Sequence, residues 1–140
     1  MKPVHILLVE DNEGDILLTS EAFAESRISN KMSVIKDGKA AINFFESLTD
    51  RREMPDLILL DINLPKKSGH EVLQYLKNSA DFKHIPVIML TTSSSEKDIL
   101  NSYQNYVNCY ITKPIDLNDF LSAVTKIEDF WISLVSIPHK

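Results

Sequence analysis

Two acidic side chains stand directly after the first apolar run of the sequence. The segment Ile6-Leu-Leu-Val-Glu-Asp-Asn12 passes from apolar residues straight to Glu10 and Asp11. One carboxylate at such a point could cap a following helix, because it accepts hydrogen bonds from the free N–H groups of the first turn. The second carboxylate needs another reason.

Three more polar residues stand at the ends of later apolar runs, namely Asp61, Thr91 and Lys113. Taken singly, Asp61 could open a turn, Thr91 could cap a helix and Lys113 could be a solvated charge. If the apolar runs are parallel strands of one sheet, however, their carboxyl ends meet at one edge, where open α/β proteins bind ligands. The acids, the hydroxyl and the amine would then converge.

Carboxylates gathered at one sheet edge raise one another's pKa values unless a cation lies among them. Mg²⁺ suits Glu10, Asp11 and Asp61, because it prefers oxygen ligands and also binds phosphate oxygens. A lysine and a hydroxyl beside such a cluster can stabilise a phosphoryl group in transfer, whose charge spreads over its oxygens. We therefore predict a Mg²⁺ site at which Lys113 and Thr91 contact the phosphoryl group. If a carboxylate is itself the acceptor of that group, Asp61 is the best choice.

The elements that must position these residues follow from the alternation of short apolar runs with segments of helical period. This alternation predicts an α/β fold, a doubly wound five-stranded parallel sheet with five helices. The expected strands are residues 4–9, 32–35, 57–60, 86–90 and 109–112. The expected helices are residues 15–27, 38–48, a third from 69, a fourth after 94–95 and a fifth after 116–119.

Composition narrows the function classes. The chain has 140 residues, which suits one domain, and its net charge of −5 argues against a surface for nucleic-acid phosphates. No apolar run approaches the length of about 20 residues that crosses a bilayer, and the amino terminus lacks a secretory pattern. We expect a cytoplasmic protein. The single cysteine and the four histidines show no metal-ligand spacing, and the three glycines form no nucleotide-binding loop.

The motifs resemble a known family. Val9-Glu-Asp-Asn, Leu60-Asp-Ile-Asn-Leu-Pro with Gly69, Leu90-Thr-Thr-Ser and Thr112-Lys-Pro look like the receiver domains of two-component response regulators, including the bacterial chemotaxis regulator. The likeness runs over essentially the whole chain. It implies a flavodoxin-like fold with strand order 2-1-3-4-5, a receiver domain over residues 1–130 and an apolar tail over residues 131–140.

The resemblance also implies a mechanism. Asp61 would take a phosphoryl group from a phosphohistidine of a sensor histidine kinase or phosphotransfer protein. Mg²⁺ would be held by Asp11 and Asp61 directly, by Glu10 through water and by the main-chain carbonyl of Asn63. Glu10 stands where the family often has Asp. The chain would not be an enzyme beyond self-phosphorylation from small donors and slow autodephosphorylation.

A switch is implied as well. Thr91 would move toward the phosphoryl group, and Tyr110, three residues before Lys113, would turn inward into the released space. The alternative is that Tyr110 is an ordinary core aromatic. The face that binds a downstream protein would comprise the fourth helix, the fifth strand and the fifth helix.

The carboxyl-terminal segment allows two interpretations. Its apolar residues 130–138 could pack on their own domain or form a homodimer or partner interface. Together with the Asn12-Glu-Gly-Asp15 segment, this tail resembles the small regulators associated with bacterial phytochrome kinases.

Two rival functions come from other classes. A haloacid-dehalogenase-like phosphatase needs a second Asp two residues after its nucleophile as general acid and base. Asn63 occupies that position here, which argues against this function. A receiver-like binding module that never takes phosphate is the second rival, and the complete acid, threonine and lysine set argues against it.

Overall fold

The computed structural model describes residues 3–25, 29–92, 109–113 and 118. Within them lies one five-stranded parallel sheet with the order β2-β1-β3-β4-β5, which confirms the predicted fold class. The strands are β1 (Val4–Val9), β2 (Asn30–Ile35), β3 (Leu57–Asp61), β4 (Val87–Thr91) and β5 (Cys109–Thr112). The helices are α1 (Glu13–Glu25), α2 (Gly38–Glu46), the short 3-10 helix η1 (Arg51–Glu53) and α3 (Gly69–Lys77).

The central strands owe their position to unbroken apolar sequence. Every residue of β1, β3 and β4 is buried, as expected for strands covered on both faces. In β2 no residue is fully buried, and this edge strand also had the weaker apolar pattern.

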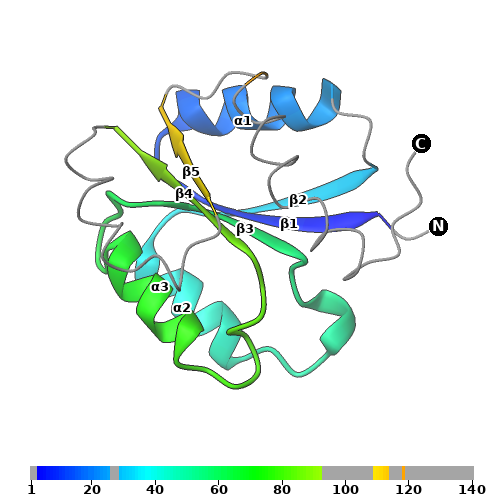
Figure 1. Cartoon of the computed structure of the whole chain (residues 1–140), viewed down its shortest axis with the longest axis vertical. Coiled ribbons are helices and arrows are strands. Elements are labelled where there is room, and N and C mark those ends of the chain that lie inside the picture. The colour runs from blue at the N-terminus through cyan, green and yellow to red at the C-terminus, as the bar shows by residue number, and fades with distance from the viewer. Residues whose placement is uncertain (1–2, 26–28, 93–108, 114–117, 119–140) are drawn as a thin grey trace.

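Helices cover both faces of the sheet (Figure 1). On the α1 face, Ile6 and Leu8 of β1 pack with Phe23 in one apolar cluster. On the opposite face, beneath α2 and α3, the alternate β1 residues belong to a second cluster that includes Phe45. The strand period of two thus divides one apolar run between two cores.

The observed boundaries differ from the expected ones in ways that local chemistry explains. Helix α1 begins at Glu13 rather than residue 15, because Asn12 Oδ1 accepts the N–H of Asp15 at 2.9 Å and so caps the first turn. Strand β4 runs from Val87 to Thr91 rather than from Pro86, and proline has no N–H for the ladder.

Three further boundaries shift by one or two residues. Strand β2 begins at residue 30 rather than 32, α2 ends at residue 46 rather than 48, and β3 ends at residue 61 rather than 60. The charged segment after α2 contains η1, whose first turn is capped by Asp50 through a 2.9 Å hydrogen bond from the Arg52 N–H. The expected fourth and fifth helices and the apolar tail lie outside the described residues, apart from Asn118.

Close backbone approaches fix the connections at the carboxyl edge of the sheet. A Cβ atom on Gly38 would lie 1.9 Å from the carbonyl oxygen of Lys67, and one on Gly69 would lie 2.2 Å from that of Asp61. Helix α3 starts with a capping box in which Ser68 and Glu71 satisfy each other's backbone N–H groups. The turn that follows β3 is therefore held tightly against the strand end.

Candidate functional site

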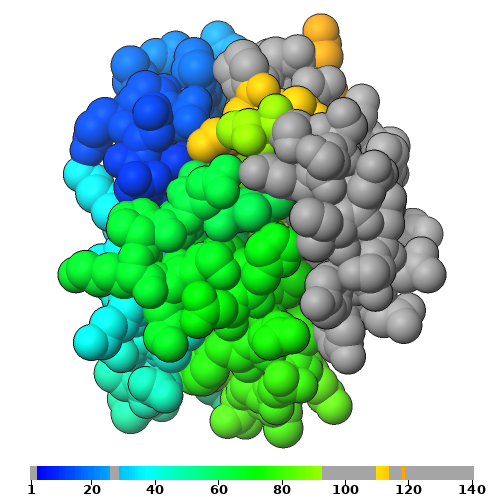
Figure 2. All heavy atoms as spheres, turned by 90° about the vertical axis from the view of Figure 1, so that its left-hand side faces the viewer, coloured from blue at the N-terminus to red at the C-terminus, as the bar shows by residue number. Residues whose placement is uncertain are grey.

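The carboxyl ends of the parallel strands meet at one edge of the molecule. Figure 2 looks onto this edge, where the blue residues after β1, the green residues after β3 and the yellow residues of β5 come together. Residues remote in the sequence become neighbours here because the strands are parallel and in register, with Asp61 opposite Leu90 and Thr91 opposite Thr112.

Three carboxylates form a compact group at this edge, which we call the acid cluster: Glu10, Asp11 and Asp61. One oxygen from each lies within 4.8 Å of the others. Glu10 and Asp61 are buried, whereas Asp11 is exposed. Burial, and next the hydrogen bond to Asp61, raise the pKa of Glu10 to about 7. The all-oxygen donor set and this crowding fit a hard divalent cation.

Lys113 lies among the same carboxylates. Its Nζ is 3.0 Å from Glu10 Oε1 and 3.2 Å from Asp61 Oδ2, and it is 2.9 Å from Asp15 Oδ2. Burial lowers the pKa of Lys113, but hydrogen bonds to Asp15 and Glu10 and the charge of Asp61 outweigh it, so the pKa is raised. The side chain is 11% exposed and carries a full positive charge at the sheet edge.

The backbone orients these two groups. The Lys113 N–H donates to the Thr91 carbonyl oxygen at 2.7 Å, which attaches the end of β5 to that of β4. At Asp61, Oδ1 accepts the N–H of Asn63 at 3.3 Å, while Oδ2 faces Lys113. The Gly69 N–H donates to the Ile62 carbonyl at 2.8 Å and closes the turn around the acid.

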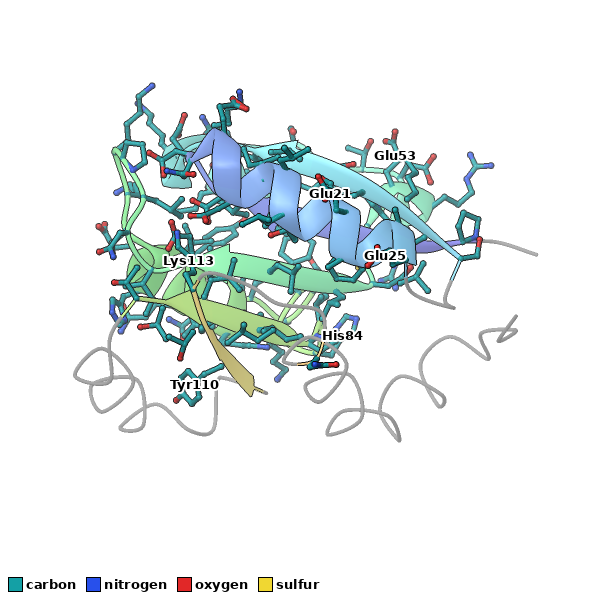
Figure 3. The ribbon with its side chains drawn as sticks, turned by 90° about the horizontal axis from the view of Figure 1, so that it is seen from above. Glu21, Glu25, Glu53, His84, Tyr110 and Lys113 are labelled. Carbon is teal, nitrogen blue, oxygen red and sulfur yellow. The ribbon has the colours of Figure 1, made fainter. Side chains whose placement is uncertain are left out.

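The remaining predicted residues have different positions. Thr91 is fully buried at the end of β4, next to the strand that carries Asp61. Asn63 is exposed two residues beyond Asp61. Tyr110 is partly buried and packs against the cluster on the α2 and α3 face, and Figure 3 shows it apart from Lys113. The structure thus joins the acid cluster to Lys113 and leaves Tyr110 outside it.

One residue of this arrangement was not predicted from the sequence, namely Asp15. It was expected only as the start of the first helix, yet it makes the shortest of the three contacts to Lys113. No sequence pattern identified it, because its contact with Lys113 depends on how the first turn of α1 is oriented against the end of β5.

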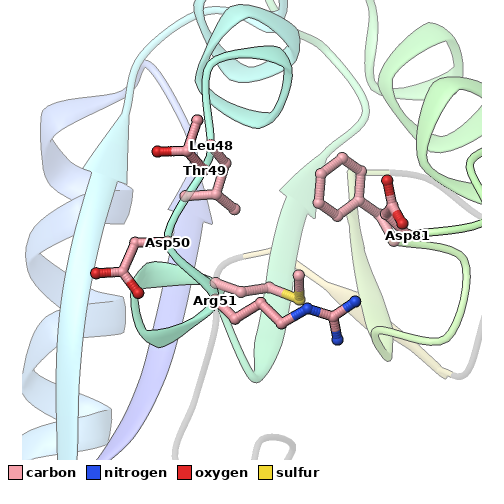
Figure 4. Close-up of a pocket in the computed structure, with 7 residues that line it drawn as sticks. Leu48, Thr49, Asp50, Arg51 and Asp81 are labelled. Atoms are coloured by element: carbon pink, nitrogen blue, oxygen red, sulfur yellow. The ribbon is translucent and has the colours of Figure 1, made fainter.

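A cavity of about 190 Å³ lies at the opposite end of the sheet, where β3 and β4 begin (Figure 4). Its lining mixes apolar and charged side chains: Leu48, Thr49, Asp50, Arg51, Met54, Asp81 and Phe82. It contains none of the acid cluster. Among the described residues, no helix has the length and apolar character needed to cross a membrane.

The fold and the site together define a class. A doubly wound parallel sheet that brings acids and one lysine to its carboxyl edge is the architecture of open α/β proteins, which bind their ligands beyond the carboxyl ends of the strands. The family model described as "Response regulator receiver domain" matches residues 6–125. The chain therefore belongs to the response regulator receiver domains, as the motifs implied.

Named relatives agree with this assignment. The chain is 44% identical over 138 residues to "Response regulator Rcp1" of Synechocystis sp. (strain PCC 6803), covering 97% of this chain and 94% of Rcp1. The solved bacteriophytochrome response regulator RtBRR superposes with a TM-score of 0.83 at 39% identity, covering 98% of this chain and 85% of RtBRR.

Two further solved structures are similar to this chain. The Mn²⁺-bound form of Rcp1 has a TM-score of 0.74 at 44% identity, with 97% of this chain and 99% of that one covered. The phosphorylated cyanobacterial phytochrome response regulator RcpA has a TM-score of 0.76 at 43% identity, with 98% and 99% covered.

Membership in this family distinguishes between a signalling receiver domain and a phosphatase. Receiver domains are generally signalling proteins rather than enzymes, so the chain is not assigned to the haloacid-dehalogenase-like phosphatases. A phosphodonor such as a histidine kinase is the partner that the family implies. The acid cluster supports divalent-metal binding at this edge, and the similar regulator Rcp1 has been solved with Mn²⁺ bound.

Proposed function

We propose that this chain is a stand-alone response regulator that accepts a phosphoryl group on Asp61. A carboxylate oxygen of Asp61 attacks the phosphorus of a phosphohistidine on a sensor kinase or phosphotransfer protein. The P–N bond breaks, the imidazole leaves with its electron pair, and an aspartyl phosphate forms. One observation carries the proposal: Lys113 Nζ lies 3.2 Å from Asp61 Oδ2 although 52 residues separate them in the sequence.

The surrounding groups match the charge that the transfer develops. The Lys113 ammonium can donate a hydrogen bond to one phosphoryl oxygen and the Thr91 hydroxyl to another. These hydrogen bonds offset the negative charge of the phosphoryl oxygens during transfer. The 2.7 Å hydrogen bond between their backbones holds the end of β5 beside the end of β4, so both residues are attached to the same edge of the sheet. Thr91 is buried on the strand next to the one that carries Asp61.

The cofactor we propose is Mg²⁺, which when bound supplies positive charge shared between carboxylate and phosphoryl oxygens. Asp11 and Asp61 would hold it directly, Glu10 through water and Asn63 by its main-chain carbonyl. The exposure of Asp11 gives the site access to solvent, and the raised pKa of Glu10, about 7, is consistent with a site whose acids are crowded without a cation.

Signal output follows from a change at the same edge. We assign the switch to Thr91 and Tyr110, with Thr91 moving toward the phosphoryl group and the Tyr110 ring turning inward. Tyr110 is suited to this role because it is partly buried on the strand whose end carries Lys113. A Tyr110 ring unchanged between free protein and a phosphoryl-mimic complex contradicts the assignment.

The partners we propose are a sensor histidine kinase of the phytochrome type and an unidentified downstream protein. The first rests on the similarity of this chain to the bacteriophytochrome response regulator RtBRR and to the cyanobacterial phytochrome response regulator RcpA. We place the protein in the cytoplasm, where such kinases present their phosphohistidine. A homodimer through the apolar tail stays a proposal, tested by solution mass before and after removal of the residues following Asp129.

Intact mass spectrometry tests the central proposal. Incubation with Mg²⁺ and acetyl phosphate is expected to add one phosphoryl group to the wild type. The group should be absent from Asp61→Asn and from samples treated with a chelator. Asp81→Asn serves as the matched control, since Asp81 is exposed at the opposite end of the sheet and should leave phosphorylation unchanged.

A negative result has a defined reading when a phosphohistidine donor is tried next. Transfer from that donor alone means that the receiver accepts only from its kinase. No transfer from either donor, in a protein that folds normally, favours the phosphorylation-independent binding module and overturns the proposal.

A further inference from the structure

Lys113 and a divalent cation need the same carboxylates. The ammonium has three hydrogens, and the carboxylates of Glu10, Asp61 and Asp15 lie around it at 3.0, 3.2 and 2.9 Å. Glu10 and Asp61 also belong to the acid cluster, so a cation bound there draws on the negative charge that now stabilises Lys113. Two positive charges sharing two acids oppose each other's binding.

Asp15 lies in contact with Lys113 but outside the acid cluster. Its position on α1 is fixed by hydrogen bonds to both its backbone N–H and its backbone carbonyl. Its N–H donates to Asn12 Oδ1 at 2.9 Å, and its carbonyl accepts from Thr19 Oγ1 at 2.7 Å. Thr19 is buried and the Asp15 side chain is 20% exposed, so this acid is a fixed partner rather than a mobile surface charge.

We propose that Asp15 is a positioning residue that retains Lys113 when a divalent cation occupies Glu10 and Asp61. It thereby lowers the repulsion between the lysine and the cation and keeps the ammonium beside the phosphoryl acceptor. This inference rests on the proposed function of the site. It adds a residue that lets Lys113 and the cation occupy the site at the same time, although both use Glu10 and Asp61.

The simplest competing explanation is general electrostatics, since any acid near the edge attracts a cation. Glu13 provides the comparison. It lies in the same first turn of α1, it is also acidic, and its carboxylate pairs with Lys36 rather than Lys113. Its side chain is 72% exposed. A general field effect acts through both acids, whereas retention of the lysine requires Asp15.

The test is calorimetric titration of the full chain with Mg²⁺ and with Mn²⁺, without a phosphoryl donor. Asp15→Asn is expected to weaken binding by about five- to tenfold, and Glu13→Gln by less than about twofold. In a Lys113→Met background, Asp15→Asn should cause little further loss, because the residue that Asp15 retains is gone. Asp15→Glu, which keeps the charge, should recover part of the affinity.

Equal losses for Asp15→Asn and Glu13→Gln overturn the inference, as does an Asp15→Asn loss that persists unchanged in Lys113→Met. Absence of cation binding by the folded wild type also overturns it. Thermal unfolding of each variant confirms that it is folded. This titration needs no phosphorylation, so its outcome is separate from that of the proposed function. If Asp61 is never phosphorylated but Asp15→Asn still weakens cation binding in the way that depends on Lys113, the proposed function is refuted and the role of Asp15 is retained.

Discussion

At the scale of single residues, buried polar groups have two different purposes in this protein. Glu10 and Asp61 are buried side by side, although each carboxylate favours water and they repel each other. His5 is buried at the other end of β1, where its Nε2 lies 2.9 Å from the hydroxyl oxygen of Ser33 and its backbone N–H donates to Asp56. The first arrangement suits binding of a cation, and the second suits only the fold.

His5 should make stability depend on pH. Burial, and next the positive charge of Lys31, lower the pKa of His5 below 6.5. The unfolded chain therefore binds a proton at higher pH than the folded chain. The stability that His5 contributes is complete above about pH 6.5 and is lost as the pH falls through the lowered value.

Urea unfolding from pH 7.5 down to pH 5 checks this expectation by comparing the wild type with His5→Gln. The wild type should lose more of its free energy of unfolding than the variant over this range. His84 is exposed, so His84→Gln is the control and should follow the wild type. Parallel curves for the wild type and His5→Gln contradict the expectation.

The residues of the site differ in how readily the sequence predicts them. Asp61 and Lys113 stand at the ends of apolar runs, and the parallel-sheet rule places such ends together without further information. The role of Asp15 depends on where α1 begins, which the Asn12 cap moved by two residues relative to the sequence pattern. To predict which side chains of a helix face a given residue, the first residue of the helix must be known. Helix boundaries are the least certain part of a prediction from sequence patterns.

At the scale of elements, the turns at the carboxyl edge depend on glycine. Gly69→Ala would place a Cβ 2.2 Å from the Asp61 carbonyl oxygen, and Gly38→Ala one 1.9 Å from that of Lys67. Both neighbours are backbone atoms, which cannot turn aside. Each substitution should cost about 1–3 kcal/mol in the free energy of unfolding, the usual range for overpacking.

Gly14→Ala is the matched control for these substitutions. Its nearest neighbour is the Asn12 side-chain oxygen at 3.2 Å, which can move by a few tenths of an ångström. Alanine also favours the helix by up to about 1 kcal/mol. Urea midpoints should therefore fall for Gly38→Ala and Gly69→Ala and stay level or rise for Gly14→Ala. A Gly69→Ala midpoint equal to that of the wild type contradicts the packing argument.

The elements themselves were largely predictable, for physical reasons. Continuous apolar runs identify β1, β3 and β4, because a strand buried on both faces excludes polar residues. The 3-10 turn of Arg51–Glu53 was missed since its charged residues are typical of a loop, and only the cap from Asp50 distinguishes it. Strand order was taken from the family resemblance, because pairing between strands leaves no trace in composition.

At the scale of the whole molecule, the site exists only when the sheet is complete. The residues that meet at the edge span positions 10 to 113 and come from the ends of β1, β3, β4 and β5 and from the first turn of α1. Two apolar clusters, one on each face, supply the free energy that holds these ends together. Stability of the fold and charge at the edge are therefore coupled, and the coupling predicts opposite effects of one substitution under two conditions.

Asp61→Asn should stabilise the metal-free protein, by about 1 kcal/mol, because it removes the charge that helps to raise the pKa of Glu10. Lys113 keeps Glu10 and Asp15 as partners. With Mg²⁺ the order should reverse, since ligand at a hundred times its dissociation constant adds about 2.7 kcal/mol to a protein that binds it only when folded. The variant lacks a carboxylate of the acid cluster and should gain less.

Urea unfolding in a chelator and again in excess Mg²⁺ measures both effects on one pair of proteins, with Asp81→Asn as a control that should follow the wild type in both. If Asp61→Asn is less stable than the wild type in the chelator, the attraction between Asp61 and Lys113 stabilises the fold more than the repulsion between Asp61 and Glu10 destabilises it. Equal gains from Mg²⁺ in both proteins mean that the cation does not use Asp61. The expected result is that Asp61→Asn has the higher free energy of unfolding in the chelator and the wild type has the higher one in Mg²⁺. This reversal identifies the acid cluster as a cation site whose acids lower the stability of the metal-free fold.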